Sequence, residues 1–291
     1  GAAICTADGV VAEQNDGGSG QTGRQLVLAA EDFRSGEGTL VRLVADKIYG
    51  EYFSRDDMNR LVYGFSPMDI DIWPTGEGYE KSDALLQKYG TYSAEYILFM
   101  NEVAKVLESR LAAEGFSGTV CLQLLAYNKT LCAPDLSRPG LTQADRDAVK
   151  LYDGDLVRCA VTVAPIECNL ALSFSDPDNR VKNPVSGAID GGSPTVAGVI
   201  LGWRALTDEV SLWLYSFDVT DYFMPLNTFD ALAENYRFAA ENGVRMLYSQ
   251  SMGDTPVAPD WSRLKMFLQA ELAKDPYADA ERLTEEFLSA Y

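Results

Sequence analysis

The sequence predicts an α/β fold built on a parallel sheet and, among such folds, a (β/α)8-type TIM barrel. Three observations carry this prediction. Short apolar runs alternate with helical periods about six times along the chain, and the crossovers between runs are ten residues or longer, as parallel strands require. The runs are also continuously apolar, which is typical of strands covered on both faces.

The expected strands and helices follow one another in chain order. Strands are predicted over residues 26–30, 61–65, 119–126, 156–163, 210–215 and 244–248. Helices, recognised by apolar residues three and four apart, are predicted over 39–48, 93–111, 196–206, 229–242, 261–274 and 279–291. Gly243 follows one of these helices at a position that favours left-handed backbone.

Two domains of different character are expected. Residues 1–24 are polar and glycine-rich and predict an irregular N-terminal arm, whereas 25–291 would form the (β/α) barrel domain. Six countable strands fall two short of a closed barrel, so we expect it to be incomplete or irregular at its N-terminal strands. An open doubly wound sheet is the alternative, although no G-x-G-x-x-G opens a helix after a strand and no Walker A loop occurs.

Charge and composition exclude several classes of protein. The net charge of −19 repels phosphate backbones, so nucleic acid is not an expected partner. No run of eighteen apolar residues occurs, so no membrane insertion is expected. The chain contains no histidine, which removes histidine-based nucleophile systems and His-ligated zinc. The five cysteines form no C-x-x-C pair and are interpreted as free thiols. No cofactor and no metal are expected.

Acidic and aromatic residues follow the predicted strands, at the edge where parallel α/β proteins collect function. Paired carboxylates with rings that stack on sugars are what glycoside hydrolysis requires, so we predict Glu167 as the acid and Asp69 as the base or nucleophile. The predicted substrate-binding residues share positions in or near strand ends and are Asp71, Trp73, Tyr127, Trp213, Tyr215, Asp218 and Gln250.

Each of these residues has a structural alternative. Asp69 or Asp71 would serve equally well as a helix cap or Asx-turn former. Glu167 would serve in a structural salt bridge, and Trp213 as a core residue within its strand. The tract 176–179, Asp-Pro-Asp-Asn, resembles a calcium loop, but a solvated turn is favoured.

Several motifs resemble a bacterial family called domain of unknown function 4838, related by fold to alpha-glucuronidases and hexosaminidases. They follow in a characteristic order from residue 25 to 291: Ser66-Pro67-x-Asp69, Asn101-x-Val103-Ala104, Pro165-Ile166-Glu167-Cys168, Trp213-x-Tyr215, Tyr222-x-x-Pro225, Asn235-x-x-Phe238, Glu241-Asn242-Gly243-Val244 and Leu264-Lys265-x-Phe267-Leu268-x-Ala270-x-Leu272-x-x-Asp275-Pro276, ending in Glu286-Phe287. The resemblance implies a glycosidase-like barrel, usually carried in exported multidomain proteins of polysaccharide-degrading bacteria. By position, Asp69 and Glu167 match the family's acids.

The sequence departs from that family at polar pocket positions. Leu214 stands where the family has an aspartate, Ser249 where an acid usually precedes Gln250, and Leu172 and Asp221 where histidine is frequent. We therefore predict a glycoside hydrolase acting on an oligo- or polysaccharide, with a non-catalytic glycan-binding or structural barrel domain of a larger polysaccharide-utilisation protein as the alternative. The chain opens at Gly1, so an upstream domain is a further expected partner, and export to the periplasm, cell surface or medium is expected.

Overall fold

A computed structural model describes most of the chain in two compact units. The described residues are 11–15, 22–26, 28–30, 39–52, 62–68, 73, 75–77, 79–217, 225–250 and 261–290. The first unit comprises Gly1–Thr162 and Ala205–Thr207, and the second comprises Val163–Arg204 and Asp208–Tyr291. Both place helices along parallel strands, and each is described separately below.

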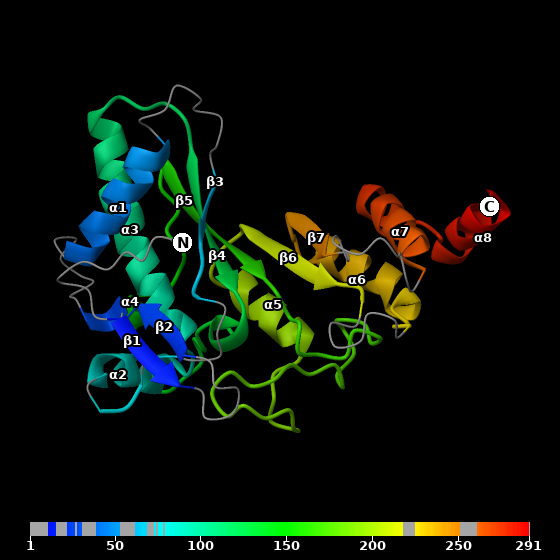
Figure 1. Cartoon of the computed structure of the whole chain (residues 1–291), viewed down its shortest axis with the longest axis horizontal. Helices are drawn as coiled ribbons and strands as arrows, with labels where there is room; N and C mark the ends of the chain where they lie inside the picture. The colour runs from blue at the N-terminus through cyan, green and yellow to red at the C-terminus, as the bar shows by residue number, and fades with distance from the viewer. Residues whose placement is uncertain are drawn as a thin grey trace. The chain divides into compact units, whose positions relative to one another are not determined.

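The first unit contains the longest helix that the structure describes and the strands nearest the N-terminus (Figure 1). Its strands are β1 (Val11–Asn15), β2 (Thr22–Leu26), β3 (Val62–Phe65), β4 (Val120–Ala126) and most of β5 (Val157–Val163). Its helices are α1 (Thr39–Tyr52), α2 (Glu80–Tyr89), α3 (Ser93–Ala113) and α4 (Gln143–Ala148), with 3-10 turns η1 (Leu28–Ala30) and η2 (Asn128–Thr130).

Helix α3 is the centre of the first unit. Its apolar face is buried, with Ile97, Phe99 and Met100 fully buried, as expected of an amphipathic helix packed on a core. Phe65 of β3 stacks on Phe99 with ring centroids 6.0 Å apart, and α1 packs against α3 (Figure 1). The helix predicted from its apolar period is therefore confirmed, and it organises the helices and strands around it.

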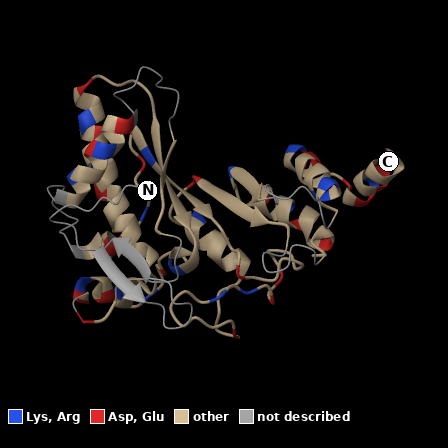
Figure 2. Ribbon diagram, viewed as in Figure 1, with Lys and Arg blue, Asp and Glu red and all other residues tan. Residues whose placement is uncertain are grey.

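The second unit continues the alternation of helix and strand. Its elements are α5 (Val196–Arg204), β6 (Val210–Tyr215), α6 (Phe229–Glu241), β7 (Met246–Gln250), α7 (Ser262–Lys274) and α8 (Ala280–Ala290). Trp203 of α5 is fully buried, as are Val210 and Leu212 of β6. Strands β6 and β7 carry no charged residue, whereas the helices of this unit do (Figure 2). Gly243 has φ +67° directly after α6, as its sequence position predicts.

The prediction of a (β/α)8-type TIM barrel, incomplete or irregular at its N-terminal strands, is wrong, although the α/β class is confirmed. In the described ranges the parallel sheet has five strands in the order β3-β4-β5-β6-β7, not eight, and parallel register pairs Val62 with Cys121 and Trp213 with Tyr248. The run at 26–30, predicted as a strand, is divided instead. Its first residue ends β2, which pairs antiparallel with β1, and η1 buries Leu28 and Ala29 in the core.

Two helices, α2 and α4, have no counterpart in the sequence prediction. Residues 80–89 were expected to lie in a loop but form α2, which buries only Ser82 and Tyr89. A helix with so little apolar surface produces no periodic signal. It ends at Gly90, whose φ of +76° and N–H bond to Leu86 form a left-handed cap. None of the helices that the structure describes is long and apolar enough to cross a membrane.

Candidate functional site

The predicted site residues are divided between the two units. Trp73 and Tyr127 belong to the first, and Glu167, Trp213, Tyr215 and Gln250 to the second. Asp69, Asp71 and Asp218 lie outside the described residues. The proposed pairing of the Glu167 and Asp69 carboxyls therefore stays a prediction, and the geometry below concerns each unit by itself.

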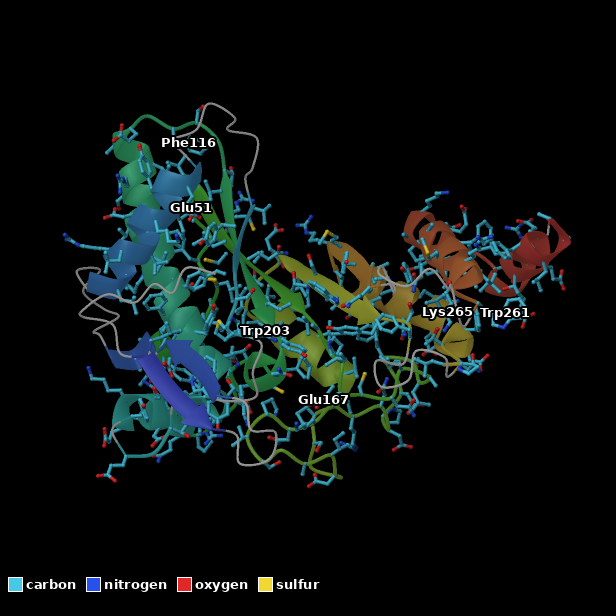
Figure 3. The ribbon with its side chains drawn as sticks, in the orientation of Figure 1. Glu51, Phe116, Glu167, Trp203, Trp261 and Lys265 are labelled. Carbon is cyan, nitrogen blue, oxygen red and sulfur yellow. The ribbon has the colours of Figure 1, made fainter. Side chains whose placement is uncertain are left out.

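Glu167 stands on the loop that follows β5, where its side chain is 46% exposed (Figure 3). Its carboxylate lies 3.3 Å from the Lys182 ammonium, and its carbonyl accepts the backbone N–H of Lys182 at 3.2 Å. A solvent-exposed ion pair contributes little to the stability of the fold. Its main consequence is a positive charge placed beside the Glu167 carboxylate. The carboxylate is accessible to a ligand and has a cation beside it.

The loop carrying Glu167 is held by a buried asparagine that sequence reasoning missed. Asn179 is fully buried; its Nδ2 donates to the carbonyls of Leu172 and Ser173, both at 3.0 Å, and its Oδ1 accepts the Asn169 N–H. Asn179 ends the tract considered as a calcium loop, but there Asp176 Oδ1 accepts the Asp178 N–H at 2.8 Å. This hydrogen bond is that of an Asx turn, as the favoured interpretation predicts.

Three predicted residues come together on β6 and β7. Trp213 donates its indole N–H to Gln250 Oε1 at 2.9 Å, and Tyr215 stands opposite Gln250 in the parallel register. A fourth residue, Tyr248, lies opposite Trp213, with its ring centroid 4.6 Å away at 66° and its surface 47% exposed. Tyr248 was not among the predicted site residues, although it ends a predicted strand, because the register that sets it beside Trp213 is not visible in local sequence.

The two predicted aromatic residues of the first unit differ in exposure. Trp73 is 4% exposed and donates its indole N–H to Glu95 at 3.1 Å, with Tyr92 and Tyr96 against its ring. Tyr127 follows β4 directly, is half-buried and has extended backbone. The structure thus accounts for Trp73 as a packing residue, and a glycan contact by either side chain stays a prediction.

Glu95 is a buried acid that the sequence analysis treated only as part of a helix start. It is 2% exposed, and its carboxylate accepts the Ala29 N–H at 2.9 Å as well as the Trp73 indole. Burial raises the pKa of Glu95 above its ordinary value, although these hydrogen bonds oppose the shift. Its contacts join η1, Trp73 and α3, which assigns it a structural role.

The thiols of the described part of the chain are free, as predicted, at Cys121, Cys132, Cys159 and Cys168. Burial raises the pKa of Cys132 and of Cys168 to about 12, and it raises the pKa of Cys159 as well. A thiol acts as a nucleophile only when ionised. These three side chains are therefore neutral at physiological pH and unsuited to nucleophilic catalysis.

Comparison with known proteins supports one assignment. The model of the family described as "Domain of unknown function (DUF4838)" matches residues 78–291, the family that the motifs of the sequence resemble. The matched region includes Glu167 and the β6–β7 aromatic residues but begins after Asp69. No curated protein matches the chain.

Proposed function

Since this chain belongs to the DUF4838 family, we propose that it is a carbohydrate-active protein and that its activity is hydrolysis of a glycosidic bond. The observation that supports this most is Glu167, an accessible carboxylate on the loop after β5. The neighbouring strands of the same sheet end at Tyr215 and Gln250. The carboxyl ends of parallel strands are where α/β proteins bind ligands.

In this proposal Glu167 works together with Asp69. One carboxyl protonates the leaving oxygen while the other activates water or attacks the anomeric carbon. The Lys182 ammonium lies 3.3 Å from the Glu167 carboxylate. In the roles that the sequence predicts, Glu167 is the acid and Asp69 is the base or nucleophile.

Substitution of Glu167 tests the proposal. Glu167→Gln is expected to lower the rate of reducing-sugar release from a responsive polysaccharide by about 10²- to 10⁴-fold, the usual contribution of a positioned acid or base. Glu285→Gln, an exposed acid on α8, is the matched control and should retain the wild-type rate. Full activity of Glu167→Gln, on a substrate that the wild type hydrolyses, would contradict the assignment.

A second function is favoured by the same ion pair. A carboxylate already neutralised by Lys182 is also suited to accept hydroxyl hydrogen bonds from a bound sugar without reacting. A non-catalytic glycan-binding domain would show saturable affinity for a polysaccharide with no release of product. Measuring both binding affinity and product release on one panel of polysaccharides distinguishes the two functions. Attachment to an upstream domain and export belong to the proposal in either case.

A further inference from the structure

A small cavity lies in the second unit, next to the loop that carries Glu167. Its volume is about 30 Å³, enough for one small polar group. Pro165 and Cys168 of that loop form one wall, and the end of β6 forms another. The remaining lining residues come from the 169–179 segment, from α6 with the residue before it, and from α7; those that matter here are Asn179, Thr228, Asn235 and Gln269.

Two buried polar atoms at this cavity have no hydrogen-bond partner among the residues that the structure describes. They are Thr228 Oγ1 and Gln269 Nε2, whose residues are 5% and 8% exposed. A polar group buried without a partner costs free energy, and most such groups in folded proteins are paired. Two of them lining one cavity therefore point to a polar occupant.

The polar side chains around these two atoms have defined partners. Asn235 Oδ1 accepts the Phe174 N–H at 2.7 Å, and the Asn179 amide donates to two backbone carbonyls. These bonds fix the shape of the cavity and its lining. Gln269 Nε2 can only donate, whereas the Thr228 hydroxyl can donate or accept. An occupant must therefore accept one hydrogen bond and either donate or accept another.

We infer that this cavity is a subsite for one hydroxyl or hydroxymethyl group of a neutral sugar. This inference rests on the proposed function and deepens it. A hydroxyl accepts from the Gln269 amide and pairs with the Thr228 hydroxyl in either direction. Leucine side chains of the lining meet the C–H groups beside it. A carboxylate or phosphate fits less well, because it would enter a protein of net charge −19.

The position of the subsite relates it to Glu167. Pro165 and Cys168 line the cavity and flank Glu167 in sequence, and Cys168 Sγ contacts the Pro165 carbonyl at 3.1 Å, which closes the loop between them. A sugar held by Thr228 and Gln269 would therefore be anchored next to the segment that presents the carboxylate. Such an anchor orients a ring without taking part in bond cleavage.

The test uses the full chain and a panel of neutral methyl glycosides of glucose, galactose, mannose and xylose. The side-chain NH₂ signals of Gln269 are assigned by their loss in Gln269→Met, with Gln87→Met as control. At least one glycoside is expected to shift these signals in a saturable way. Thr228→Val should weaken that affinity roughly threefold to tenfold, the effect of one neutral hydrogen bond, while Thr284→Val on α8 should leave it unchanged.

Stability separates a ligand site from a site for structural water. If the Thr228 hydroxyl has no partner in the ligand-free protein, its removal costs no hydrogen bond. The melting temperature of Thr228→Val should then be unchanged or raised. A lowered melting temperature with unchanged glycoside affinity would show a bound water and overturn the inference, as would a panel in which no glycoside moves the Gln269 signals. Either failure leaves the proposed function standing if Glu167→Gln still abolishes hydrolysis. Glycoside binding without any hydrolysis supports the subsite and contradicts the hydrolase.

Discussion

Replacement of Lys265 by methionine is expected to lower the free energy of unfolding by about 3 kcal/mol. Lys265 lies on α7 (Figure 3) and is only 2% exposed. Its ammonium donates to the carbonyls of Ser216 and Leu226 at 2.9 and 2.7 Å and lies 5.6 Å from the centre of the Phe229 ring. Methionine fills a similar volume but cannot donate, so both carbonyls would lose a charged partner.

The size of this effect follows from two opposing contributions. Hydrogen bonds from a charged donor contribute more than neutral ones, and here they join the residue after β6 to the segment before α6. Against this, methionine removes the cost of burying a charge, which keeps the expected loss well below the sum of two broken bonds.

Urea denaturation followed by far-UV circular dichroism measures the loss. The matched control is Lys274→Met, on the same helix with a side chain 70% exposed and a half-buried partner, Glu271; it should change stability by no more than about 0.5 kcal/mol. If Lys265→Met and Lys274→Met had the same urea midpoint, the carbonyls of Ser216 and Leu226 would have found other hydrogen-bond donors in the folded protein.

The elements that could be predicted from the sequence are those whose burial is continuous along the chain. β4 and β6 were found because each is a run of apolar residues, and α3 because its core residues recur at helical spacing. α2 was missed because its stability comes from few buried side chains and a cap at Gly90. The predicted number of strands was wrong for a different reason. Whether a five-residue apolar run joins a sheet depends on its tertiary pairing, and residues 26–30, predicted as one strand, divide between β2 and η1.

The same distinction explains what was found at the candidate site. Trp213 and Gln250 were predicted from their positions on or after strands, and the structure joins them by a hydrogen bond. Tyr248, Thr228 and Gln269 gave no local signal, because their importance arises from register and from burial without a partner. Properties of this kind depend on segments distant in the sequence.

Replacement of Glu95 by glutamine is expected to destabilise the protein by about 2 kcal/mol at acidic to neutral pH. Among its hydrogen bonds, the carboxylate accepts the Ala29 N–H at one oxygen and the Trp73 indole N–H at the other. Glutamine keeps the shape but replaces one oxygen by NH₂, so one of the two donors would face another donor. Denaturation of Glu95→Gln beside Glu114→Gln, an exposed acid just after α3, measures the difference.

The pH dependence of this difference has a definite sign. Because burial raises the pKa of Glu95 above the ordinary value of 4.5, the folded protein binds this proton more tightly than the unfolded chain does. That stabilisation is fully present below pH 4.5 and is lost as the pH rises through the folded pKa. Glutamine does not titrate, so the deficit of Glu95→Gln relative to wild type should be greatest in acid and shrink as the pH rises.

A double-mutant cycle with Trp73→Phe shows whether the indole hydrogen bond is the interaction lost. Phenylalanine retains much of the ring packing against Tyr92 and Tyr96 but has no N–H to donate to Glu95. If glutamine turns its amide towards the indole, the two substitutions together should cost less than their sum, by about 1 kcal/mol. Additive losses would instead place the unfavourable contact at Ala29, since the amide would then face η1 and leave the indole bonded to oxygen.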